Sequence, residues 1–375
     1  MSKRPPIYGL DIIRCLAAFL VLYFHIGYIS WLEPTDVLRK HMAGPPLVPP
    51  GWQLGSVGWI GVEIFFVVSG VVIAYSMEGI SAGGFVRRRA LRLVPALLIC
   101  TSLAAVIALF FFQTPFREVA LLWWRTNLFV PAAPWLIGQF WTLPIEVVFY
   151  GLVWLLICFR QQARIEALAW VLAVLSLSYW VTTSLFGVHD PHGRTSQLLL
   201  LQQGCYFALG VLLSQIDRKG ISASRLALGV VCLLSAPFEI RSTVIYFQAA
   251  ATAPELLPAG PNVVGTLMVF VVFVGAIACS LAFKETIAAR VGRLAEPIRQ
   301  AGLLSYPLYL IHMHAGGVAL ILAWNSGAPI PLAIFTASAV AIAVSLSVSM
   351  VAEPWLRKRI SQALDRAASR WARAQ

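Results

Sequence analysis

Long runs of apolar residues, separated by short polar segments, follow one another along the whole chain. A helix needs about 20 predominantly apolar residues to cross the hydrocarbon core of a bilayer. Ten runs approach this length, at residues 10–30, 56–77, 93–112, 140–159, 167–187, 197–214, 224–240, 262–282, 302–324 and 330–351. The runs are continuous and do not alternate with polar residues, which is not typical of a transmembrane β-barrel. The pattern therefore predicts an all-α, polytopic transmembrane bundle of about ten spans.

The chain ends in a segment of a different kind. Residues 1–352 form the expected transmembrane domain, and residues 353–375 form a basic tail. Apolar residues recur in this tail at helical spacing, with arginines between them: Trp355, Leu356, Ile360, Leu364, Ala367 and Trp371. This predicts an amphipathic helix lying on the anionic inner surface of the membrane. A frayed basic tail is the alternative.

Composition and charge narrow the class of protein further. Apolar residues make up 59% of the chain and charged residues 12%, whereas soluble domains average about 45–50% and 25%. These values exclude a soluble globule, a coiled coil and a disordered chain. The net charge of +12 then reflects the positive-inside rule and not nucleic-acid binding. The six cysteines lie in apolar runs without a C-x-x-C pair, so neither disulfides nor a metal site is expected.

The distribution of basic residues predicts the orientation. With the N-terminus inside, inner segments collect 21 of the 28 Lys and Arg residues, and six lie outside. The run at 224–240 is short and contains Pro237, but omitting it would erase this asymmetry, so it is kept as a span. Both termini are then cytoplasmic. The first run carries Arg14 and His25 and lacks a following cleavage site, so it is read as a retained helix and not a signal peptide.

Ionisable side chains inside the predicted spans are candidates for a functional site, because they are costly there. Arg14 and His25 lie eleven residues apart, which places them on one helix face about 16 Å apart along the axis. Counting residues inward from the outer surface puts Glu63 and Glu146 at the depth of His25. A satisfied structural network is the alternative, and an isolated pair of these residues would favour it. The three together favour a site.

A basic cluster at residues 87–92 opens the third span. Such clusters often serve only as topology signals, but Arg89 and Arg92 are one turn apart and can bind one anion together. Arg14 lies at nearly the same level. A polyphosphate bound here would sit one long arm away from His25, as the nucleotide of coenzyme A sits one pantetheine arm from its thiol. The spacing therefore suggests an acyl donor with a nucleotide tail.

Six motifs occur in an order that is known from one family of membrane enzymes. They are Leu10-Asp11 with Arg14, ten residues and His25; Gly61-Val62-Glu63 through Ser69-Gly70; Arg89-Ala90-Leu91-Arg92; Trp141-Thr142-Leu143-Pro144-Ile145-Glu146 with Phe149-Tyr150; Ser305-Tyr306 through Tyr309 and His312; and Glu353-Pro354. By these motifs the chain resembles the acyltransferase-3 family over nearly its whole length. It departs from the usual pattern at Glu63, where Asp is frequent, and at Thr142, where Ser is usual.

The resemblance implies an O-acyltransferase of the bacterial cytoplasmic (inner) membrane. Such enzymes move an acyl group, most often acetyl from acetyl-CoA, onto a hydroxyl of a carbohydrate or glycan precursor. The expected partners are thus acyl-CoA, a carbohydrate acceptor and membrane lipid, with no metal and no nucleic acid. The expected roles are a general base at His25, a ring-holding acid at Glu146 or Glu63, phosphate binding by Arg14, Arg89 and Arg92, and substrate contacts from Tyr150, Tyr306, Tyr309 and His312.

Three alternatives stay open at this point. A covalent acyl-enzyme is possible in principle, although no G-x-S-x-G pattern marks a serine nucleophile. A transporter of an acyl group or lipid-linked sugar would use the intramembrane charges as a substrate path, but it predicts inverted repeats, which are not visible in the sequence. A haem protein would need His25 and His312 at one depth, and residue counting places His312 deeper.

Overall fold

The structure, a computed structural model, describes residues 6–33, 36–187, 193–250 and 262–374, and its regular elements there are all helical. The α-helices are α1 Tyr8–Phe24, α2 Ser30–Leu32, α3 Trp52–Val57, α4 Gly61–Ser76, α5 Ala82–Phe110, α6 Phe116–Asn127, α7 Thr142–Cys158, α8 Ile165–Phe186, α9 Arg194–Leu198, α10 Gly204–Lys219, α11 Ala223–Ala250, α12 Val263–Ala282, α13 Lys284–Val291, α14 Ala295–Ile311, α15 Gly317–Asn325, α16 Ile330–Ser347 and α17 Glu353–Ala374. Three π-helical turns, η1 His25–Ile29, η8 His312–Gly316 and η9 Val348–Ala352, and five 3₁₀ turns, η2 Arg39–His41, η3 Gly58–Ile60, η4 Gly138–Trp141, η5 Gln162–Arg164 and η7 Gly292–Leu294, connect them.

Within the described ranges, nine helical stretches are long and apolar enough to cross a membrane. They are Tyr8–Leu32, Trp52–Ser76, Ala82–Phe110, Gly138–Cys158, Gln162–Phe186, Ala223–Gln248, Val263–Ala282, Lys284–Asn325 and Ile330–Arg366. The predicted all-α polytopic bundle is thereby confirmed, including the doubtful seventh run. The remaining predicted run, 197–214, becomes α9 and α10. Because α10 has only 16 residues, it falls short of the length expected for a full crossing.

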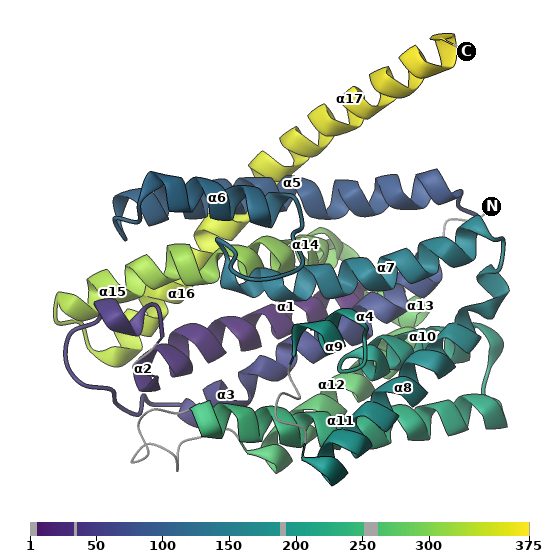
Figure 1. The fold of residues 1–375 in the computed structure, drawn as a ribbon, viewed down its shortest axis with the longest axis horizontal. Coiled ribbons are helices and arrows are strands. Elements are labelled where there is room, and N and C mark those ends of the chain that lie inside the picture. Colours follow the sequence, from purple (N-terminus) through teal and green to yellow (C-terminus); the bar gives the residue numbers. More distant parts are fainter. Residues whose placement is uncertain (1–5, 34–35, 188–192, 251–261, 375) are drawn as a thin grey trace.

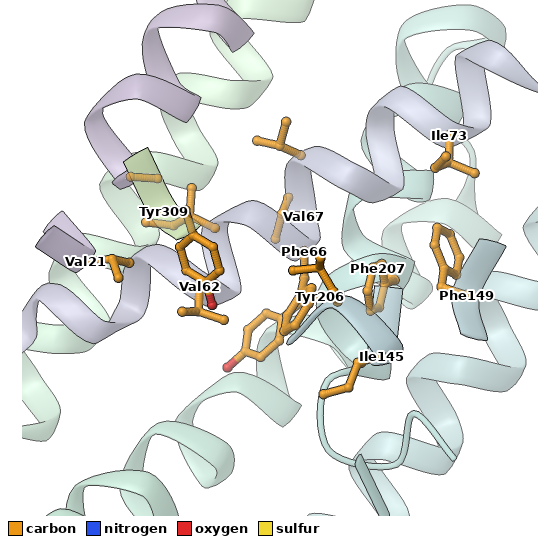
Figure 2. Close-up of a cluster of buried hydrophobic side chains, with 14 of the residues drawn as sticks. Val21, Val62, Phe66, Val67, Ile73, Ile145, Phe149, Tyr206, Phe207 and Tyr309 are labelled. Carbon is orange, nitrogen blue, oxygen red and sulfur yellow. The ribbon is translucent and has the colours of Figure 1, made fainter. Parts of the chain in front are cut away.

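The core of the bundle is built where α10 packs between α4 and α8. Aromatic rings fill the space between α4, α7 and α10, as Figure 2 shows. The Phe149 and Phe207 rings stack with centroids 4.4 Å apart, and the Phe66 ring lies 4.8 Å from that of Phe207. Such aromatic pairs add specific geometry to van der Waals packing, so this cluster fixes the relative positions of three helices.

Two glycines let α4 and α10 approach each other closely. A Cβ atom added to Gly210 would lie 2.0 Å from the carbonyl oxygen of Val67, and one added to Gly70 would lie 2.3 Å from that of Phe207. Backbone therefore packs directly on backbone at this crossing. Small residues at helix interfaces play this part in membrane bundles, where no hydrophobic effect drives helices together.

We expect Gly210→Ala to destabilise the protein by about 1–3 kcal/mol, the usual cost of overpacking a tight core. The thermal unfolding midpoint of the detergent-purified protein measures this. Gly275→Ala in α12 is the matched control, because its added Cβ would meet no atom within 4 Å. An equal loss in both variants would contradict a special role for the α4–α10 crossing.

The segment between the third and fourth predicted spans is not a simple loop. After α5 the chain turns and α6 folds back along it (Figure 1). The Asn127 amide donates to Thr101 Oγ1 at 3.0 Å, and Trp123 Nε1 donates to Ser102 Oγ at 3.2 Å. Polar pairs of this kind between helices hold them together in an apolar surrounding. The sequence shows α6 poorly, because it is too short to score as a span.

The C-terminal helix α17 leaves the bundle beside α5 (Figure 1). The Arg87 guanidinium on α5 pairs with Asp365 at 2.8 Å and donates to Ser361 Oγ at 2.8 Å. These contacts fasten the middle of α17 to the helix that carries the basic cluster. The tail is thus helical as predicted, and its location on the membrane surface stays a prediction.

Candidate functional site

A cavity of about 500 Å³ opens between α1, α4, α5, α7, α14 and α17. It brings together seven of the ten residues singled out in the sequence: Arg14, Arg89, Arg92, Glu146, Tyr150, Tyr306 and Tyr309. Its apolar wall includes Val62 and Phe66, two of the side chains drawn in Figure 2. Residues from five of the six sequence motifs therefore meet at one cavity.

Positive charge dominates this cavity. Among the described residues that line it are five arginines and a single acid, Glu146; the arginines are Arg14, Arg88, Arg89, Arg92 and Arg357. Nε of Arg89 and both Nη atoms of Arg92 are buried, and no described residue accepts a hydrogen bond from them. Buried cationic donors without partners are expensive. The arrangement is suited to an anion that would accept these hydrogen bonds.

Aromatic rings hold the arginines in place. The Arg89 guanidinium lies 5.6 Å from the Phe85 ring and 5.7 Å from the Tyr150 ring, and that of Arg92 lies 5.6 Å from the Tyr306 ring. A guanidinium over an aromatic face is attracted by the ring's negative electrostatic potential. Tyr150 and Tyr306 thus orient the basic side chains as well as lining the cavity.

Glu146 is bound inside the cavity and not to a histidine. Its Oε1 accepts hydrogen bonds from Ser69 Oγ and from the Tyr150 hydroxyl, both at 2.6 Å. The expectation that Glu146 holds the His25 ring therefore does not hold. Ser69 comes six residues after Glu63, about 9 Å along the helix, so the two acids do not share a depth either.

The two histidines of the signature motifs meet directly. Nε2 of His312 lies 3.2 Å from Nδ1 of His25, so the greater depth predicted for His312 is wrong. Neither histidine is among the described residues that line the arginine cavity. Tyr309 lies between the histidine pair and the cavity. Tyr309 lines the cavity, and its ring centroid lies 6.4 Å from that of His312.

Hydrogen bonds assign the protons on both rings. Nδ1 of His25 lies 2.9 Å from the Val21 carbonyl oxygen, and Nδ1 of His312 lies 2.9 Å from that of Leu308. A carbonyl oxygen only accepts, so each Nδ1 carries a hydrogen. The single His25 Nδ1–H is then shared between the Val21 carbonyl oxygen and the lone pair of His312 Nε2, and His25 Nε2 is left unprotonated. His312 is fully buried and His25 is half-buried, so the accessible basic nitrogen belongs to His25.

Both histidines stand at the first residue of a π-helical turn, η1 and η8. A third π turn, η9, leads into Glu353. A π turn holds one extra residue, which opens the helix locally, and such turns are frequent at functional sites. The contact between His25 and His312 therefore rests on a local departure from α-helical geometry in each of their helices.

Glu63 lies apart from both groups. A Cβ on Gly61 would approach the Ala17 carbonyl oxygen to 2.5 Å, so the start of α4 lies level with a part of α1 about eight residues before His25. It is buried, and it interacts electrostatically with the buried Glu239 of α11. The Tyr206 hydroxyl donates to Glu239 at 2.6 Å. Glu63 thus belongs to a separate polar cluster between α4, α10 and α11, and the shared depth with His25 does not hold.

Comparison with known families agrees with the geometry. The family model for the acyltransferase domain of the acyltransferase-3 family matches residues 7–351, which contain every signature motif except Glu353-Pro354. The chain belongs to the acyltransferase-3 family. No curated protein and no solved structure matches it. The protein is accordingly a membrane acyltransferase, and its all-α bundle is the structure of that domain.

Sequence reasoning missed two basic residues of the acyltransferase cavity. Arg88 was counted only as a topology signal, and Arg357 was assigned to the tail, yet both line the cavity. Arg357 follows the Glu353-Pro354 motif by one helical turn, and this spacing was the available signal. Ser69, the partner of Glu146, was also within a recognised motif but received no role.

Proposed function

We propose that this acyltransferase moves an acyl group, most simply acetyl, from acyl-coenzyme A to a hydroxyl of a carbohydrate or glycan precursor. The observation that carries the proposal is the arginine cavity. Phosphates accept several charge-assisted hydrogen bonds and match the forked guanidinium group. Unpartnered donors on Arg89 and Arg92 are what such a ligand would satisfy. By the charge bias, this cavity opens towards the cytoplasm of a bacterial inner membrane, where acyl-CoA is made.

In the proposed reaction His25 is the general base. The acceptor hydroxyl oxygen attacks the thioester carbonyl carbon while His25 Nε2 removes the hydroxyl proton. The carbon–sulfur bond then breaks, the acyl group stays on the acceptor oxygen, and coenzyme A leaves as the thiol after taking that proton back from His25. No other reactant is needed. Histidine suits both proton transfers because its ordinary pKa lies near neutral pH.

His312 takes the supporting part that the sequence suggested for an acid. When His25 is protonated, its Nδ1–H gains partial positive charge, and His312 Nε2 is placed to accept that hydrogen bond at 3.2 Å. The acid of a hydrolase triad orients its histidine in a comparable way. We therefore reassign His312 from substrate contact to positioning residue. Tyr150, Tyr306 and Tyr309 keep their proposed substrate contacts as part of the cavity wall.

Binding of acetyl-CoA to the purified, full-length protein tests the proposal. We expect saturable binding by calorimetry, and release of free coenzyme A, detected by chromatography, when a carbohydrate acceptor is supplied. A transporter would instead move a solute across proteoliposomes without releasing coenzyme A. Absence of both binding and release with the folded protein would overturn the proposed donor.

A further inference from the structure

The C-terminal helix contributes a basic residue to the donor cavity. Glu353 opens α17 and is 2% exposed, and Arg357, one turn later, forms an ion pair with it. The pair leaves Nε of Arg357 buried and without an acceptor among the described residues. A buried carboxylate that holds an arginine at a cavity wall keeps that guanidinium from swinging into solvent. Arg357 is therefore a built part of the cavity and not a loose tail residue.

The cavity arginines differ in depth. Both Nη atoms of Arg92 are buried, whereas Arg89 and Arg357 each have only Nε buried and unpartnered. The Arg357 side chain is 38% exposed, and Arg88 is also exposed. Of the five cavity arginines, Arg88 and Arg357 thus form an outer pair nearer to solvent, and Arg89 and Arg92 lie with Arg14 on the inner side. Arg357 is instead held by the buried Glu353 at the start of its own helix.

Coenzyme A carries its phosphates in a matching order. Starting from the thiol, the pantetheine arm leads to a pyrophosphate, and the ribose beyond it carries a separate 3′-phosphate. This terminal phosphomonoester has about −1.5 to −2 charges at pH 7. With the thioester directed towards His25, the pyrophosphate meets the inner arginines first. The 3′-phosphate then lies towards the solvent side, where Arg357 and Arg88 are.

The geometry points to Arg357, held by Glu353, as the residue that binds the 3′-phosphate of coenzyme A and selects against donors lacking it. This assignment rests on the proposed acyl-CoA function and adds to it a basis for donor selectivity. A guanidinium fork pairs with two phosphate oxygens at once. Loss of a hydrogen bond to a charged group of this kind usually costs enough to weaken binding by roughly tenfold to a hundredfold.

The test compares the dissociation constants of coenzyme A and 3′-dephospho-coenzyme A for the full-length protein in detergent. We expect the wild type to favour coenzyme A by roughly 10- to 100-fold. Arg357→Gln combined with Glu353→Gln removes the cation without leaving a buried unpaired carboxylate. In this double variant the preference for coenzyme A should fall to about threefold or less, while the dissociation constant of the dephospho compound should change little. Arg357→Lys, which keeps charge but not the fork, should give an intermediate ratio.

Two controls separate the possible results. Arg359→Gln removes a cation two residues along α17 that lies over the Trp355 ring, 5.5 Å away, and it should leave the ratio unchanged. Arg92→Gln should weaken both compounds alike. Equal binding of the two compounds to the wild type contradicts the assignment of Arg357 but leaves the proposed donor intact. An unchanged ratio of the two dissociation constants in both the double variant and Arg357→Lys has the same meaning. Failure of the folded wild type to bind either compound removes the proposed donor, and this assignment with it.

Discussion

His25→Ala protein will bind acyl-CoA normally and transfer the acyl group about 10²–10⁴-fold more slowly, the usual scale of general-base catalysis. The two effects separate because the arginines proposed to bind the phosphates lie in the cavity, which His25 does not line. Transfer is measured as coenzyme A release in the presence of acceptor, and binding by calorimetry. His41→Ala, an exposed histidine in the η2 turn, is the control and should transfer normally.

The same experiment examines the contact between the two histidines. If His312 acts only through His25, adding His312→Ala to His25→Ala will cause little further loss, because residues that act as one unit fail together. A merely structural role for His312 would add its own loss to that of His25. Normal transfer by folded His25→Ala protein would contradict the mechanism and would favour an acyl-enzyme or a transport role.

Replacing both Arg89 and Arg92 with alanine is expected to weaken acyl-CoA binding by at least about a hundredfold. Each side chain points unpartnered donors into the cavity, and a hydrogen bond between charged groups contributes about 1.5–3 kcal/mol. Acyl-pantetheine, which has no phosphate, should bind equally well to the wild type and the double variant. The dissociation constants of both compounds, measured at one fixed salt concentration, give the comparison.

Arg87→Ala is the matched control for this pair. Arg87 belongs to the same basic cluster but pairs with the exposed Asp365 on the surface, and exposed ion pairs contribute little. Its loss should leave donor binding unchanged. An equal effect of Arg87→Ala, or no effect of the double variant, would reduce the cluster to a topology signal.

The sequence predicted the architecture well because membrane spans are set by a one-dimensional property, the length of an apolar run. It also placed Arg89 and Arg92 together correctly, since residues one turn apart in one helix share a face and a level, and both line the cavity with Arg14. The 12-residue helix α6 was missed, and the short buried helix α10 was counted as a full span. Neither matches the span length on which the prediction depends.

Residue counting failed where depth had to be compared between helices. Glu63 and Glu146 were given one depth, but Glu146 hydrogen-bonds to Ser69, which lies about 9 Å along α4 from Glu63. Relative depth depends on tilt and packing, which a hydrophobic pattern does not encode. His312 was placed too deep for the same reason.

The π turns at His25 and His312 have a consequence for the comparison of distant relatives. Each turn accommodates one residue more than an α-helix over the same rise. A homologue that lacks the turn would therefore differ by a single-residue deletion inside a transmembrane helix, where insertions and deletions are ordinarily not placed. Alignments that forbid gaps within spans would rotate every position beyond residue 29 or residue 316 by about 100°, the angle between successive residues. Lipid-facing side chains would then be equated with interior ones.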